Sequence, residues 1–220
     1  MSRRRQEIVV GAGLVAVTVY GFIVLPLRPW LLGVAPDLLA VVTGSRPALI
    51  AVGALAAAEG RPWLWPLLAS IVSIVKFHWV FWWAGRLWGE KALVRVAGSG
   101  RRSRRRIDQA QALVRRYQVL AVAVTYVPLP VARELVFVAI GTAGVPFRRF
   151  LAVDLTIAAL TQTTFFLLGV WLGESAVAVV REYALYAGWI ALAVLAVMTI
   201  AGVRALCERR ERRVSTRPSP

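Results

Sequence analysis

Long runs without a charged residue constrain this chain more than any other feature. The first, residues 8–26, is long enough as a helix to cross a hydrocarbon core of about 30 Å. Hydrophobic residues make up 59% of the 220 residues, and nine residues are Trp. One soluble domain could not bury that much apolar surface, so we expect an integral membrane protein. We expect an uncleaved first span over 8–26, because no small-residue cleavage site follows a short apolar core.

Five further apolar segments follow the first span. They cover residues 32–59, 63–88, 118–142, 150–172 and 183–205. The formal net charge of +16 does not indicate nucleic-acid binding, because the basic residues lie between membrane segments rather than on a soluble scaffold with stacking aromatics. The single Cys207 gives no disulfide framework. We interpret residues 1–220 as one membrane domain that ends in a basic cytoplasmic tail, 206–220.

The basic residues predict which segments cross the membrane. Twenty-one of the 27 Lys and Arg lie in four polar stretches, at residues 1–7, 86–117, 143–149 and 204–217. Short loops rich in Lys and Arg stay cytoplasmic, so all four stretches are expected on that face. This holds only if segments 32–59 and 118–142 turn back within the bilayer while the other four cross it. Both termini are then cytoplasmic.

Proline interrupts both segments that are expected to turn back. Pro47 lies near the middle of the first, and a Pro-Leu-Pro sequence at 128–130 lies in the second. The arms on each side are too short to cross the hydrocarbon core. Broken backbone at membrane depth must be covered by protein or water. The charged residues Arg46, Arg133 and Glu134 at these breaks are therefore expected to line an internal, partly wet site.

An internal repeat relates the two halves of the chain. A shift of 84 positions superposes "GRP" at 60–62 on "GVP" at 144–146, and "GRLWGE" at 85–90 on "GVWLGE" at 169–174. Each copy would hold a proline-broken re-entrant hairpin followed by a transmembrane helix, and the copies would run in opposite directions. Such inverted repeats characterise secondary transporters, whose substrates bind near the midplane. Chance coincidence of common Gly and Pro residues is the alternative. The predicted fold is all-α, with two inverted repeats and extra transmembrane helices at both ends.

Several short sequences, taken in order, resemble the DedA family within the wider VTT, or SNARE-associated Golgi protein, group. They are "GALAAAEG" at 53–60, "FWWAGRLWG" at 81–89, "PVAREL" at 130–135, "VPFRRF" at 145–150 and "GVWLG" at 169–173. The resemblance covers roughly residues 40–175. It implies two facing re-entrant hairpins and lipid transport across the bacterial cytoplasmic membrane. It also implies return of undecaprenyl or decaprenyl phosphate carriers to the inner leaflet, with proton or sodium coupling.

The residues implied by this resemblance carry over only in part. Arg133 falls on the family's arginine after the hairpin proline. Arg46 stands where the family usually has an acidic residue in the first hairpin. His78 stands in place of an aspartate, and Val127 in place of an arginine. These departures change the groups expected to couple transport to an ion.

A lipid phosphate that crosses the bilayer needs fixed positive charge and hydrogen-bond donors. Arginine provides both, because its planar guanidinium can hold two phosphate oxygens and stays protonated when desolvated. Arg46 and Arg133, one from each hairpin, are predicted to converge on the phosphate, with Lys76 as a third substrate-binding residue. The candidates for coupling transport to an ion are Asp37, Glu134, Asp154 and His78, and Lys76 is expected to balance the charge of one of the three carboxylates.

Each candidate also has a structural alternative. Arg133 and Glu134 would then be a buried pair that only fixes the hairpin, and Arg46 would extend to the interface. His78 is interpreted as an interior polar group or a pH-sensitive neighbour of the site rather than a metal ligand, because the sequence holds no second His. We expect neither a metal nor another cofactor.

Lipid transport is preferred over three other functions. An enzyme would need a nucleophile with a base, or clustered carboxylates, and the sequence shows neither, so no catalytic residue is predicted. The first alternative is a small-ion or solute channel or exporter on the same inverted-repeat fold. The second is a membrane scaffold that transports nothing.

Residues 101–117 are predicted to form a cytoplasmic amphipathic helix. Ile107, Ala110, Val114 and Tyr117 recur at helical spacing and form its apolar face. The other faces are strongly basic, so residues 101–116 are expected to bind anionic lipids of the inner leaflet.

Overall fold

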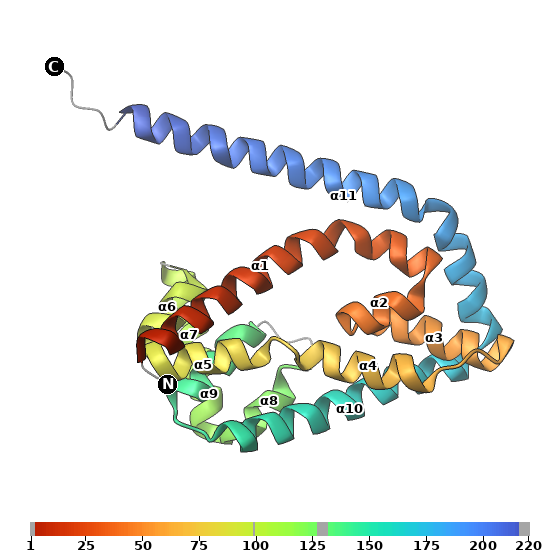
Figure 1. Ribbon diagram of the computed structural model, residues 1–220, viewed down its shortest axis with the longest axis horizontal. Coiled ribbons are helices and arrows are strands. Elements are labelled where there is room, and N and C mark those ends of the chain that lie inside the picture. The colour runs from red at the N-terminus through yellow and green to blue at the C-terminus, as the bar shows by residue number, and fades with distance from the viewer. Residues whose placement is uncertain (1–2, 99, 127–131, 216–220) are drawn as a thin grey trace.

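The computed structural model describes residues 3–98, 100–126 and 132–215, and every regular element in these ranges is helical (Figure 1). The helices are α1 (Arg3–Val34), α2 (Pro36–Thr43), α3 (Arg46–Glu59), α4 (Leu64–Val75), α5 (His78–Trp88), α6 (Glu90–Ala97), α7 (Arg101–Tyr117), η1 (Gln118–Leu120), α8 (Ala121–Val124), α9 (Arg133–Thr142), α10 (Phe147–Leu172) and α11 (Glu174–Ser215). The predicted all-α class is confirmed.

Among the described residues, four helical stretches are long and apolar enough to cross a membrane, and they overlap the four predicted spans. They are Arg3–Val34, Leu64–Trp88, Phe147–Leu172 and Glu174–Ala201. The first continues through Pro26 and Pro29, which membrane helices tolerate because neighbouring groups satisfy the freed backbone. The last begins at Glu174 rather than at residue 183. These lengths and compositions support a membrane protein.

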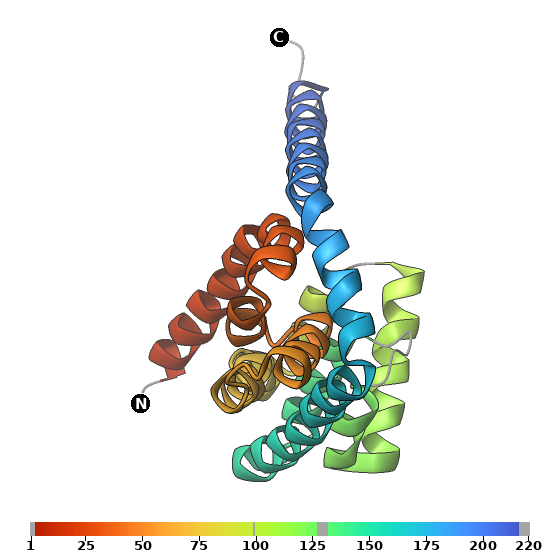
Figure 2. The same cartoon turned by 90° about the vertical axis from the view of Figure 1, so that its right-hand side faces the viewer.

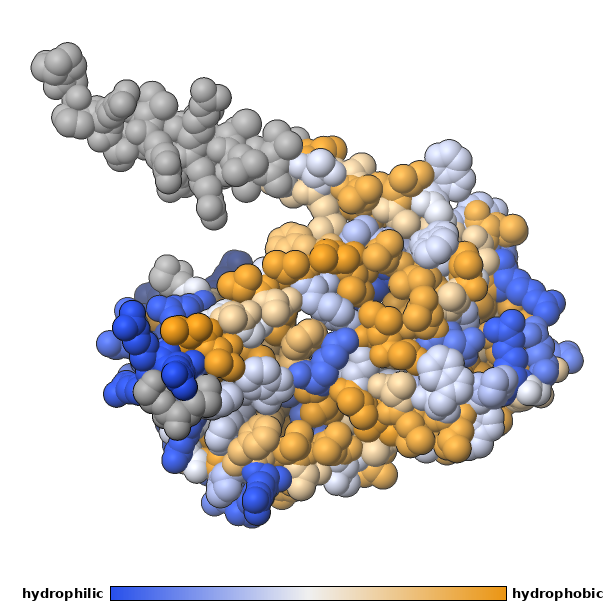
Figure 3. All heavy atoms as spheres, viewed as in Figure 1, coloured by the Kyte–Doolittle hydropathy of each residue, from blue (hydrophilic) through white to orange (hydrophobic). Residues whose placement is uncertain are grey.

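Apolar side chains form the middle of the face seen in Figure 3, between two hydrophilic ends. One end holds the start of α1 with α6 and α7, and the other holds the turn between α3 and α4. Large apolar side chains are widely exposed, including Phe22 at 64% and Trp171 at 81%. A surface this apolar is suited to contact with lipid.

The first predicted hairpin is broken at Gly44 rather than at its proline. Gly44 adopts φ 64°, and its N–H donates to the Ala40 carbonyl oxygen, which ends α2. A Cβ on Gly44 would lie 2.8 Å from the Ile74 Cβ, so only glycine fits this turn. Pro47 is the second residue of α3, where its missing N–H has no partner within the helix.

The segments around the second predicted break differ from the first. Residues 118–124 form η1 and α8, and α9 begins at Arg133. Pro128 and Pro130 lie outside the described residues, as does Val127. The predicted span 63–88 is made of two helices, α4 and α5, joined at Lys76 and Phe77. This interruption was not predicted from the sequence.

Two helix crossings share the same close contact between glycines. Gly85 of α5 lies against Gly141 of α9. A Cβ on Gly85 would overlap the carbonyl oxygen three residues before Gly141, and a Cβ on Gly141 would overlap the carbonyl oxygen three residues before Gly85. Gly53 of α3 and Gly169 of α10 cross in the same way. Each crossing therefore joins a short helix after a break, α9 or α3, to a helix that belongs to a candidate span in the other half of the chain, α5 or α10. Small residues allow such close approach of helix backbones.

Two turns also recur in the two halves. Gly60 and Gly144 both have positive φ, at 66° and 78°, and each lies two residues before a proline. Gly89 follows the last residue of α5 and Gly173 that of α10, with nearly equal angles, φ 53°, ψ −130° and φ 51°, ψ −129°. Figure 2 shows α1 on one side of the central α3, α4 and α10 helices and the α6–α8 region on the other.

Candidate functional site

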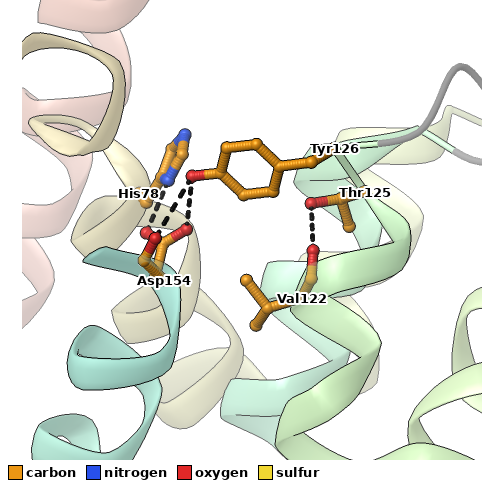
Figure 4. Close-up of polar contacts among 5 residues, drawn as sticks. All are labelled: His78, Val122, Thr125, Tyr126 and Asp154. Carbon is orange, nitrogen blue, oxygen red and sulfur yellow. Dashed lines mark hydrogen bonds and ion pairs between the residues drawn. The ribbon is translucent and has the colours of Figure 1, made fainter. Parts of the chain in front are cut away.

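A buried carboxylate organises the polar centre of the fold (Figure 4). Asp154 of α10 is fully buried, and its Oδ2 lies 2.7 Å from Nδ1 of His78 at the start of α5. The Tyr126 hydroxyl donates to Oδ1 over 2.8 Å. The two carboxylate oxygens of Asp154 thus each hold one partner, His78 on one and Tyr126 on the other. The His78 ring also packs on Phe137, with 4.4 Å between centroids, which joins α5, α9 and α10.

Tyr126 links this buried pair to two arginines. Arg46 Nη2 donates to the Tyr126 carbonyl oxygen over 2.7 Å, and the Arg133 guanidinium carbon lies 5.1 Å from the centre of the Tyr126 ring. Both arginines are half-buried. We call His78, Tyr126, Asp154, Arg46 and Arg133 the Tyr126 cluster. Four of its five members were sequence candidates, and the structure brings them together.

Arg46 and Arg133 occupy the same position in two helices. Each is the first residue of its helix, and the preceding residues have nearly equal backbone angles: φ −66°, ψ 125° at Ser45 and φ −65°, ψ 123° at Ala132. Among the described residues, no side chain caps either helix start. The first backbone N–H groups and the positive ends of both helix dipoles therefore face the region of the two arginines.

The arrangement suits an anion with several oxygens. The Arg46 guanidinium also lies over the Phe165 ring, 5.2 Å from its centre, which fixes its plane. Because both guanidinium groups lie on Tyr126, their charges repel each other, and a bound phosphate would neutralise that repulsion. Asp154 and His78 hold Tyr126 from the side opposite its backbone, so they position the residue that both arginines contact.

Lys76 lies at the end of α2 instead of beside a carboxylate. Its ammonium donates to the Val42 carbonyl oxygen, to Tyr20 Oη over 2.9 Å and to Ser73 Oγ over 3.1 Å. These acceptors use all three of its protons. Val42 is among the last residues of α2, whose carbonyl groups have no partner within the helix. Lys76 therefore stabilises the broken end of α2, and the structure does not join it to the Tyr126 cluster.

We expect Lys76→Met to lower the free energy of unfolding by about 1.5 to 3 kcal/mol, the usual worth of hydrogen bonds to a charged group. The apolar stem is kept, but the Val42 carbonyl loses its charged donor. Thermal unfolding in a mild detergent measures the effect, with Lys91→Met on the exposed part of α6 as the matched control. If Lys76→Met left stability unchanged but abolished transport, Lys76 would instead act as a substrate-binding residue.

Two acidic candidates lie outside the Tyr126 cluster. Asp37, at the start of α2, pairs with Arg61 over 3.5 Å, and Arg61 in turn pairs with Glu59 over 3.1 Å. Asp37 is thus at the opposite end of α2 from the Gly44 break. Glu134 is exposed in the first turn of α9, where its charge favours the positive end of the helix. Neither is placed to balance Lys76.

Two polar residues of the centre were not expected from the sequence. Tyr126 was not predicted because a tyrosine in an apolar segment is usually a packing residue; its place two residues before the Pro-Leu-Pro sequence was the available signal. Gln162 of α10 is fully buried, and its Nε2 donates to the Gly44 carbonyl oxygen over 3.0 Å. Among the described residues, its Oε1 has no hydrogen-bond partner. Gln162 therefore fixes the turn between α2 and α3 from the neighbouring span.

The predicted amphipathic helix is present as α7, but protein covers part of its apolar face. Ala110 and Val114 are buried in the core, and Ile107 packs against it. Tyr117 is 43% exposed. The arginines of residues 101–106 remain exposed. In the described part of the chain, no three His, Cys, Asp or Glu side chains are grouped as metal ligands.

Comparisons of the chain with family models, with curated proteins and with solved structures found no match. The function is therefore inferred from the residues and their geometry.

Proposed function

We propose that this chain is a DedA-type transporter that moves an anionic lipid, of the polyprenyl phosphate class, across the bacterial cytoplasmic membrane. The observation that carries the proposal is the meeting of Arg46 and Arg133 on Tyr126. A phosphate that leaves water needs such fixed cations, while the hydrocarbon tail of the lipid can stay in the bilayer. The carrier would be returned to the inner leaflet for reuse.

An inverted repeat would explain why two arginines reach one point. The reciprocal glycine crossings, Gly53 with Gly169 and Gly85 with Gly141, support such a repeat. So do the matching starts of α3 and α9. In this proposal α2–α3 and α8–α9 enter the bilayer from opposite sides as re-entrant hairpins, and four spans cross it. The basic stretches and both termini then lie in the cytoplasm.

The Tyr126 cluster would hold the phosphate during passage. The guanidinium groups and the first N–H groups of α3 and α9 would replace the water lost by the head group. Asp154 and His78 would keep Tyr126 in place. Coupling to protons would therefore act through the His78–Asp154 pair, since Asp37 and Glu134 lie elsewhere.

The test is transport by the full chain reconstituted in liposomes, with a fluorescent polyprenyl phosphate and, separately, a fluorescent glycerophospholipid. Arg133→Gln should slow polyprenyl phosphate transport by about 10- to 100-fold, because a hydrogen bond to a charged group is lost. Arg102→Gln, which removes an exposed charge from α7, is the matched control and should keep the normal rate.

Three other outcomes would contradict the proposal. A normal rate with Arg133→Gln would remove this residue from the mechanism. Ion flux without lipid movement by the unmodified chain would favour a channel. Transport of neither lipid, with no ion flux, would favour a scaffold.

A further inference from the structure

A hollow of about 410 Å³ lies between the end of α7 and the turn that joins α9 to α10. Its lining includes Arg115, Gln118 and Arg149, together with Val119 and Val145. Trp82 Nε1 donates to the Val145 carbonyl oxygen over 3.1 Å, which holds the turn in place. The hollow thus combines two cations and an amide with a partly apolar wall. It does not include any residue of the Tyr126 cluster.

A third arginine lies beside the same turn. A Cβ on Gly144 would stand 3.0 Å from Nη1 of Arg86, so this guanidinium packs directly against the glycine. None of Arg86, Arg115 and Arg149 forms an ion pair with a carboxylate in the described part of the chain. Arg149 also lies in the first turn of α10, where the helix dipole disfavours a cation. The stability of α10 therefore does not explain this arginine.

Gln118 has a backbone conformation that normally requires glycine. Its angles are φ 51° and ψ −127°, nearly the same as those of Gly89 and Gly173. All three residues end a helix and donate their N–H to the carbonyl four residues earlier. Glycine would adopt this corner without strain, whereas glutamine is strained there. Gln118 is among the residues that line the hollow, together with Arg115 and Arg149, and its side chain carries an amide.

We propose that this hollow is a discrete binding site for the phosphate head group of an anionic membrane lipid. Arginine pairs hold phosphate oxygens in a fixed geometry, and the Gln118 amide adds a donor. A lipid fits better than a free anion because apolar residues also line the hollow: Val114, Val119, Val145 and Pro146. The site also lies beside the basic α7 helix, which attracts anionic lipid.

The test uses the purified full chain in an uncharged detergent and follows its melting temperature. Phosphatidic acid is expected to raise the melting temperature, while phosphatidylcholine with the same chains and inorganic phosphate are not. Arg115→Gln with Arg149→Gln should weaken phosphatidic acid binding about tenfold or more, since charged hydrogen bonds are lost. Arg102→Gln with Arg105→Gln removes the same charge from α7 outside the hollow. This pair should weaken phosphatidic acid binding less than about threefold.

Gln118→Gly provides the second, opposite readout. It should raise the melting temperature without lipid, because strain is relieved, and reduce the shift caused by phosphatidic acid, because the amide is lost. A purely structural Gln118 would leave the lipid shift unchanged, which would overturn the proposal. Equal weakening by both arginine pairs would show only diffuse attraction, and an equal shift with inorganic phosphate would show a free-anion site; either result also overturns it.

Discussion

Gly141→Ala is expected to lower the free energy of unfolding by about 3 kcal/mol or more, the upper part of the usual cost of overpacking. The added Cβ would overlap the Trp82 carbonyl oxygen and lie 3.0 Å from its carbonyl carbon. Both neighbours are helix backbone and cannot move away as a side chain would. Helices α5 and α9 would have to separate, and α9 is buried from Leu135 to Gly141. Yield and unfolding in a mild detergent measure this loss.

The glycine crossings supply their own controls. Gly169→Ala should cost a similar amount, because its Cβ would overlap the Ile50 carbonyl oxygen in the equivalent crossing. Gly21→Ala should be neutral or stabilising, since nothing lies within 4 Å of its Cβ position and alanine favours a helix by about 1 kcal/mol. If Gly141→Ala were as stable as Gly21→Ala, the close crossing of α5 and α9 would be wrong.

Asp154→Leu is expected to destabilise the chain by about 2 to 6 kcal/mol, because each of the two buried groups that lose their hydrogen-bond partner costs about 1 to 3 kcal/mol. The change would leave the His78 Nδ1 and the Tyr126 hydroxyl without their hydrogen-bond partner in a buried site. Transport should also fall, because Tyr126 would no longer be held where Arg46 and Arg133 contact it. Unfolding in detergent and the liposome assay measure the two effects.

Two variants separate the hydrogen bonds of Asp154 from its charge. Asp154→Asn should cost less than Asp154→Leu, because the Tyr126 hydroxyl and the His78 ring can each exchange donor and acceptor roles. Asp108→Leu, on the exposed face of α7, should have little effect on stability. A fully stable Asp154→Leu chain would mean that the buried carboxylate does not organise the centre.

Hydropathy located the apolar segments, and the positions of the basic residues selected four of them as spans. In the described part of the chain, the four stretches long enough to cross a membrane overlap these predicted spans, because the preference of an apolar helix for lipid depends on local sequence. The break between α4 and α5 was not predicted, since the residues at Lys76 and Phe77 contain no proline or glycine. Its cause is tertiary: Lys76 contacts Val42, Tyr20 and Ser73.

The candidate site was predicted in part. Arg46, Arg133, His78 and Asp154 stood out because charged or titratable side chains are rare in apolar segments. Their sequence positions could not show that all four would meet at Tyr126. The same rarity led to Asp37 and Lys76, which have separate local roles. An unusual charge therefore marks a polar contact in the membrane but does not identify its partner.

The amino-acid sequence by itself determined the all-helical class and the approximate positions of the apolar spans, because helix formation and burial in lipid follow from neighbouring residues. Only the tertiary structure decided which polar groups meet. Arg46 and Tyr126 are separated by 80 positions, and they are in contact because α3 and α10 cross closely at Gly53 and Gly169 while Asp154 of α10 holds Tyr126. Such contacts depend on how closely helix backbones approach, which is a property of the packed molecule.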